Sequence, residues 1–225
     1  MPDARPGPCV ARPEGRGRSV TLKGMATLRD TQKRMTRTAL LEQGLALFMD
    51  KGYASTTIDD IAVAAGATRA TFYLHFSSKA DLVRSLVART NEMLTSTDKP
   101  PLTEVVASGD RSVVRAFLSR KFDQWPDIRP YITVSHQAAA AEPDIQTTID
   151  QWFDDAIANM QAGLDATGRF DAGSRRVRCS LAFGELEFFS RRWMRLGWIV
   201  DRDSALETMT DSWFQLLCDD GRDSA

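Results

Sequence analysis

Residues 57–76, TIDDIAVAAGATRATFYLHF, read as two short helices joined by a tight turn. Thr57, with Asp60 three residues later, has the pattern of a capping box at the start of the first helix. The apolar positions of this helix recur at helical spacing: Ile58, Ile61, Ala62 and Ala65. Gly66 suits the turn because a residue without a Cβ adopts a positive φ at little cost, and Thr68 can cap the second helix. Two helices around a glycine turn have the layout of a DNA-binding helix-turn-helix.

The second helix carries side chains suited to reading DNA. Phe72 and Phe76 lie four residues apart and mark its buried side, while small and polar residues face outward. An arginine at position 69 can donate two hydrogen bonds to guanine, and threonine can contact thymine or phosphate. The residues that we expect at the DNA are Thr57, Thr68, Arg69, Thr71, Tyr73, His75 and Lys79. For this helix alone, an ordinary amphipathic helix remains an equal alternative.

A further helix start follows almost at once, at Ser78-Lys79-Ala80-Asp81. With it, residues 28–86 resemble the DNA-binding domain of the tetracycline-repressor (TetR) family. The resemblance rests on Phe48, on the Gly52-Tyr53 pair, on the helix that ends at Gly66 and on the Thr-Phe-Tyr-x-His-Phe run of residues 71–76. It implies an all-α fold, a dimer built by the C-terminal helices, and a regulator, most often a repressor, that responds to a ligand.

The charge distribution divides the chain into a basic and an acidic part. Residues 1–24 hold five Lys/Arg and two Asp/Glu, residues 25–90 hold nine and six, and residues 91–225 hold fifteen and twenty-two. Phosphate contact at one end and an acidic body at the other fit this pattern. We expect three segments: a disordered extension at 1–24, a DNA-binding domain at 25–78, and an effector-binding and dimerisation domain at 79–225. The extension is either a plain tail or a basic arm that reaches DNA.

Other classes of protein find little support. The three cysteines and two histidines have no metal-ligand spacing, so we expect no metal or other cofactor, and the cysteine usage indicates a reducing cytoplasm. There is no nucleophile elbow, phosphate-binding glycine loop or zinc-protease motif, so an enzyme is not expected. No apolar run is long enough to span a membrane.

The rest of the chain predicts further helices and no strands. We expect helices at about 29–50, 79–95, 112–125, 130–141, 143–166, 174–196 and from 204 onward. Pro126 is expected to stop one helix, and Pro130 and Pro143 to open the next two. Ser204 with Glu207 has the pattern of a capping box.

Two functional surfaces are expected on the body. Aromatic residues with one polar partner are candidates to line an effector pocket: Phe117, Trp125, Tyr131, His136, Trp152, Phe153 and Phe183. Apolar stripes on the last two helices are candidates for a dimer interface: Val177, Leu181, Phe188, Leu206, Met209, Trp213 and Leu217. The alternative for both sets is an ordinary intrachain core.

The sequence therefore predicts an all-α, homodimeric regulator. Its expected partners are a palindromic double-stranded DNA operator and a small apolar or aromatic effector that releases it. The competing hypotheses are a helical protein-interaction module and a small-molecule enzyme without DNA binding.

Overall fold

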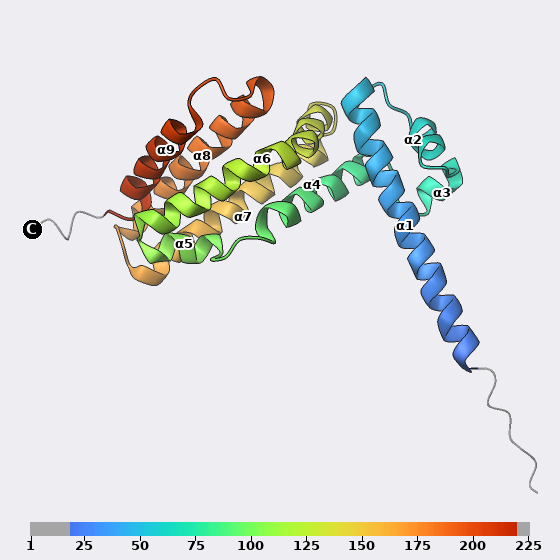
Figure 1. Ribbon diagram of the computed structural model, residues 1–225, viewed down its shortest axis with the longest axis horizontal. Coiled ribbons are helices and arrows are strands. Elements are labelled where there is room, and N and C mark those ends of the chain that lie inside the picture. Colours follow the sequence, from blue (N-terminus) through green and yellow to red (C-terminus); the bar gives the residue numbers. More distant parts are fainter. Residues whose placement is uncertain (1–18, 220–225) are drawn as a thin grey trace, which may run out of the picture.

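The computed structural model describes residues 19–219, with side chains from residue 27 onward, and this part is all-α as predicted (Figure 1). Its helices are α1 Ser19–Lys51, α2 Ile58–Ala64, α3 Arg69–Tyr73, α4 Lys79–Thr95, α5 Leu102–Ser108, α6 Arg111–Ala139, α7 Pro143–Thr167, α8 Ala172–Leu196 and α9 Arg202–Leu217. No helix of the described part has the length and apolar character needed to cross a membrane.

The first four helices share one apolar core. Figure 1 shows α2 and α3 on the side of α1 that faces away from the body. Phe48, Phe72, Phe76 and Leu82 are almost fully buried between these helices. The same cluster includes Val134 of α6 and residues of α7, so the DNA-binding part packs directly on the body. The boundary near residue 78 stays a prediction.

The body is a bundle in which α6, α7, α8 and α9 lie side by side, with the short α5 packed on α7 at one end (Figure 1). Aromatic residues dominate its core. Trp125 packs against Phe122 at a centroid distance of 4.4 Å, and Phe117 stacks on Trp213 at 6.0 Å. The stripe predicted for dimerisation on α9 belongs to this core: Leu206, Met209, Trp213 and Leu217 are all buried within one chain.

That burial corrects the expected dimer interface. Trp213 has no exposed surface, and its indole N–H donates to the carbonyl oxygen of Ala182 on α8 at 2.9 Å. The apolar stripe of α9 is covered by α6 and α8 of its own chain, so it is not available to a second copy. The α8 residues of the prediction are different, since Val177, Leu181 and Phe188 are exposed.

Two helix starts and one additional helix also differ from expectation. Helix α1 begins at Ser19, so residues 19–24 are helical rather than disordered, while residues 1–18 lie outside the described part. Helix α5 was not predicted. Helix α9 is capped by Asp201, whose carboxylate accepts the N–H of Ser204 at 2.7 Å, three residues before the expected cap.

The largest difference is that α6 is continuous where two helices were expected. Pro126 and Pro130 lie inside it. A proline in a helix interior removes one backbone hydrogen bond and costs about 3 kcal/mol. Burial on both sides of the prolines offsets this cost, because Phe122 and Trp125 pack in the body and Val134 and Ala138 pack against the DNA-binding part. Burial of a larger apolar side chain such as Phe122 or Val134 contributes roughly 1.5–3 kcal/mol.

Candidate DNA-binding surface and effector cavity

The predicted helix-turn-helix forms with its expected caps. The Thr57 hydroxyl accepts the N–H of Asp60 at 3.1 Å, and the Asp60 carboxylate accepts the N–H of Thr57 at 3.0 Å. Gly66 has a φ of +65°. Around it, the N–H of Ala67 donates to the Ala62 carbonyl at 2.8 Å and that of Gly66 to the Val63 carbonyl at 3.0 Å, which is a Schellman ending.

Helix α3 presents its polar side to solvent. The Thr68 hydroxyl accepts the N–H of Thr71 at 3.1 Å, so both threonines are engaged at the helix start. Phe72 and Phe76 are buried as predicted, which leaves the opposite face accessible. That face consists of Thr68, Arg69, Ala70, Tyr73 and Leu74, with Thr71 partly exposed.

Arg69 is held in place by its neighbours. Its guanidinium donates to Asp59 of α2 at 2.7 Å and to the Tyr73 hydroxyl at 3.4 Å. The hydrogen bond and charge of Asp59 raise the pKa of Arg69 above its usual value. Because the pair is exposed, it adds little stability, yet it fixes the fork at the outer edge of the two helices. A fixed planar fork is the group that reads guanine in the major groove.

His75 lies where α3 meets the basic part of α1. Burial lowers its pKa, and the nearby charges of Lys33 and Arg37 lower it further. The Arg37 guanidinium lies 4.4 Å from the ring centre of Phe76 and donates to Ser85 of α4 at 2.9 Å. The basic residues of α1 and the recognition helix therefore belong to one surface.

Lys79, which was expected at the DNA, is bound to backbone carbonyl oxygens of its own chain. Its ammonium donates to the carbonyl oxygens of Tyr53 at 2.8 Å and Thr56 at 2.7 Å, and it lies 4.5 Å from the ring centre of Tyr53. Burial lowers its pKa. The side chain thus ties the start of α4 to the turn between α1 and α2, which indicates a positioning role in place of a solvent-exposed phosphate contact.

The body encloses a cavity of about 470 Å³, the effector cavity, between α4, α6, α7, α8 and α9. Most of the predicted pocket residues line it: Phe117, Trp125, His136, Trp152, Phe153 and Phe183. Tyr131 does not. It packs in the core shared with the DNA-binding part, where the Arg89 guanidinium lies 5.9 Å from its ring centre. Trp213, expected at the dimer interface, also lines the cavity.

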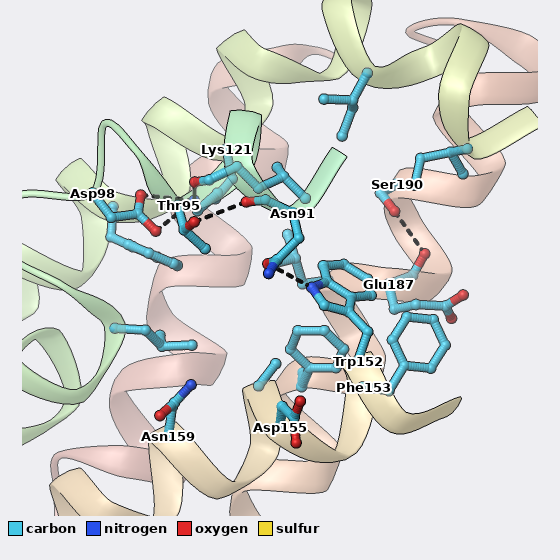
Figure 2. A pocket seen from close by; sticks show the side chains of 18 of the residues that line it. Asn91, Thr95, Asp98, Lys121, Trp152, Phe153, Asp155, Asn159, Glu187 and Ser190 are labelled. Carbon is cyan, nitrogen blue, oxygen red and sulfur yellow. Dashed lines mark hydrogen bonds and ion pairs between the residues drawn. The ribbon is translucent and has the colours of Figure 1, made fainter. Parts of the chain in front are cut away.

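Polar groups of α4 and its following loop complete the cavity wall, and sequence reasoning missed them. Figure 2 shows Lys121 reaching Asp98, with nitrogen–oxygen distances of 2.7 and 2.8 Å. Lys121 also donates to the carbonyl oxygen of Leu94. Burial lowers the pKa of Lys121, while the hydrogen bond and charge of Asp98 oppose that shift. The Trp152 indole donates to Asn91 of α4 at 2.9 Å across the same cavity (Figure 2).

A second charged pair lies on α8. Glu187 and Arg191 are 2.7 Å apart and both line the cavity. Burial raises the pKa of Glu187, and Arg191 opposes that shift. On the same helix, the residues with exposed apolar side chains form a separate face, with exposed fractions of 60% for Val177, 55% for Leu181 and 62% for Phe188.

Comparison with known proteins agrees with this architecture. Residues 40–86 match the family model described as bacterial regulatory proteins, tetR family. The transcriptional activator FasR of Mycolicibacterium smegmatis is 26% identical over 187 residues, which cover 79% of this chain and 81% of FasR. The regulator TtgR of Pseudomonas putida is 42% identical over 57 residues, but these span only 25% of this chain and 27% of TtgR.

Among solved structures, the SmeT–triclosan complex superposes with a TM-score of 0.62 at 20% identity, covering 79% of this chain and 90% of SmeT. This likeness shows a shared fold. The relatives in sequence are named as transcriptional regulators, which agrees with the expectation that the chain is not an enzyme. Residues 40–86 therefore carry a DNA-binding helix-turn-helix domain of the TetR family of bacterial regulatory proteins.

Proposed function

We propose that the chain is a homodimeric repressor whose hold on a palindromic DNA operator is released by a small apolar or aromatic effector. The observation that carries this proposal is the course of α4. Leu82 and Leu86, near its start, pack in the core of the DNA-binding part, while Asn91, Leu94 and Thr95, near its end, line the effector cavity. A molecule in the cavity therefore touches the helix that leads to α3.

The DNA contacts follow from the exposed face of the helix-turn-helix. We assign base reading to Arg69, Thr71, Tyr73 and His75, and phosphate contact to Thr57 and Thr68 at the helix starts and to the basic residues of α1. Two copies place two recognition helices about 34–36 Å apart, one helical turn of DNA, or at a multiple of that spacing, which requires a palindromic site.

Dimerisation is assigned to α8 alone. Val177, Leu181 and Phe188 recur at intervals of four and seven residues, so they lie on one side of the helix, and all three are exposed. An apolar stripe of this kind on two copies can pack helix against helix. The outward positions of α9, such as Thr208, Asp211 and Gln215, are polar and support no such contact.

The effector class is inferred from the cavity wall. Phe117, Trp125, Trp152, Phe153 and Phe183 present aromatic surface, which suits an apolar or aromatic molecule. SmeT, which shares the fold, holds the aromatic compound triclosan in its solved complex. FasR is named an activator, so the direction of control is a separate question for a reporter assay. With chromosomal DNA as the partner, the expected location is the cytoplasm.

The experiment starts from DNA selected by the full chain from a random pool. A palindromic site that is bound less tightly as salt rises supports the proposal, whereas no retention of DNA even at low salt contradicts it. Compounds that raise the melting temperature are then titrated into the DNA complex. To reverse a 99:1 preference, a compound must favour the released state by about 5.5 kcal/mol.

Two tryptophan variants test whether the effector cavity controls DNA binding. Trp152→Ala enlarges the cavity and removes the hydrogen bond to Asn91, so the ligand response changes while DNA affinity without ligand stays nearly constant. Trp198→Ala is the control, because Trp198 lies outside the cavity wall. If every stabilising compound leaves DNA affinity unaltered in the wild type, the chain is not switched through this cavity.

A further inference from the structure

A second hollow lies beside the effector cavity, where the body meets the end of α1. Its volume is about 350 Å³. The residues that line it are Met49, Arg129, Ile132, Thr133, His136, Arg191, Met194 and Arg195. Three of these are arginines, and no carboxylate belongs to the described wall. We call this hollow the arginine groove.

Two of the three arginines lack a countercharge. Arg191 is paired with Glu187, but Arg129 and Arg195 form no ion pair within residues 27–219. Lys121, which lines only the effector cavity, is already saturated by both carboxylate oxygens of Asp98 and by the Leu94 carbonyl. The unmatched positive charge beside the cavity therefore lies in the groove. Guanidinium groups bind carboxylates and phosphates through paired, charge-assisted hydrogen bonds.

The two hollows share four lining residues. Ile132, His136, Arg191 and Met194 line both of them. The aromatic chamber of about 470 Å³ and the groove of about 350 Å³ therefore adjoin at these four residues. A ligand that uses both needs an apolar body and, at one end, an acidic group.

We propose that the arginine groove is the head-group site for an amphipathic anion, whose apolar part fills the effector cavity and whose carboxylate or phosphate group binds Arg129 and Arg195. This inference rests on the proposed function and narrows its effector class. Met49 belongs to α1, so the acidic group would lie against the DNA-binding part itself. In Figure 1, α2 and α3 lie on the far side of α1, so the groove is remote from the DNA-reading face.

The test compares probes that share one twelve-carbon chain: dodecanoate, dodecyl phosphate, methyl dodecanoate and dodecyltrimethylammonium, each below its micelle concentration. Calorimetry and thermal shift on the full chain measure binding. We expect at least one anion to bind about tenfold or more tightly than both the neutral ester and the cation. The anion preferred, carboxylate or phosphate, identifies the head group.

Two substitutions test whether the arginine groove causes the preference for anion over ester. Arg129→Gln and Arg195→Gln remove one positive charge each, and we expect both to lose most of the preference for anion over ester. The control is Arg115→Gln on α6, since Arg115 pairs with Glu207 and lines neither hollow. It should keep the preference. Circular dichroism and melting temperature verify that all three variants fold.

Several outcomes would overturn the assignment. These are equal binding of ester and anion, tighter binding of the cation, no binding of any anion, or an intact preference in both groove variants. A drop in DNA affinity without ligand in Arg129→Gln or Arg195→Gln would assign the groove to DNA phosphate instead. If the anion binds in the groove but leaves DNA affinity unchanged, the ligand-switched regulator fails while the anion site stands.

Discussion

Arg69 joins the two helices of the DNA-reading unit through one side chain. Because Asp59 and Tyr73 orient its guanidinium, it is poised at the surface before DNA arrives. We expect Arg69→Ala to cost on the order of 1–3 kcal/mol of operator affinity and to relax base preference at one position in each half-site. Competition binding with single-base operator variants measures both effects.

Asp59 provides the control for Arg69, because its carboxylate accepts a hydrogen bond from the guanidinium. Asp59→Asn keeps the arginine but weakens its tether, so affinity should fall by less than in Arg69→Ala while the order of preferred bases is retained. Base preference that is untouched in Arg69→Ala would move the reading function to other residues of α3.

Lys79 illustrates how an ammonium can serve the fold. Replacing it with methionine leaves the carbonyl oxygens of Tyr53 and Thr56 without this donor. Loss of partners for half-buried polar groups costs about 1–3 kcal/mol. We therefore expect Lys79→Met to lower the free energy of unfolding by that amount, as measured in urea.

Lys33→Met provides the contrast, since Lys33 is exposed on the basic surface of α1. It should leave stability unchanged and reduce the salt dependence of DNA binding by about one phosphate contact. The opposite pattern, with Lys79→Met reducing the salt slope and not the stability, would restore Lys79 to the phosphate contacts.

Among the helices, α6 contains two prolines that lower the free energy of unfolding. Pro126 is exposed, so its main effect is the missing N–H that would donate to the Phe122 carbonyl. Pro126→Ala should raise the free energy of unfolding by up to about 3 kcal/mol, the difference between proline and alanine in a helix interior. Urea unfolding of the variant beside wild type checks this value.

A Pro126→Ala variant that is equally stable or less stable would mean that α6 depends on the bend or packing that the proline provides. Pro130→Ala serves as a comparison because Pro130 is partly buried, so its replacement combines a gained hydrogen bond with a lost contact.

Sequence reasoning succeeded where local chemistry decides the structure. The box of Thr57 and Asp60, the positive φ of Gly66 and the cap at Thr68 each depend on residues within four positions. Local patterns failed at α6, because the burial that outweighs its prolines comes from helices far away in the sequence. They could not reveal the pair of Lys121 and Asp98 either, since a charged residue on a helix ordinarily faces solvent.

At the scale of the whole molecule, the same limit explains the misplaced dimer surface. An apolar stripe shows that a helix face is covered, but not which chain covers it. The stripe of α9 is covered by its own chain, while α8 presents apolar side chains on two sides. One side of α8 lines the effector cavity, and the other remains exposed around Phe188.

Aspartate substitutions distinguish the exposed apolar face of α8 from the buried apolar stripe of α9. Phe188→Asp places a charge in the proposed contact between two α8 helices, so the protein should sediment as a folded monomer. Specific DNA binding should then collapse, because a monomer holds one half-site, while weak nonspecific binding persists. Trp213→Asp, which also introduces a carboxylate, should instead abolish folding, since Trp213 is fully buried against Phe117 and Ala182. If Phe188→Asp remains a dimer, this face of α8 is not the interface.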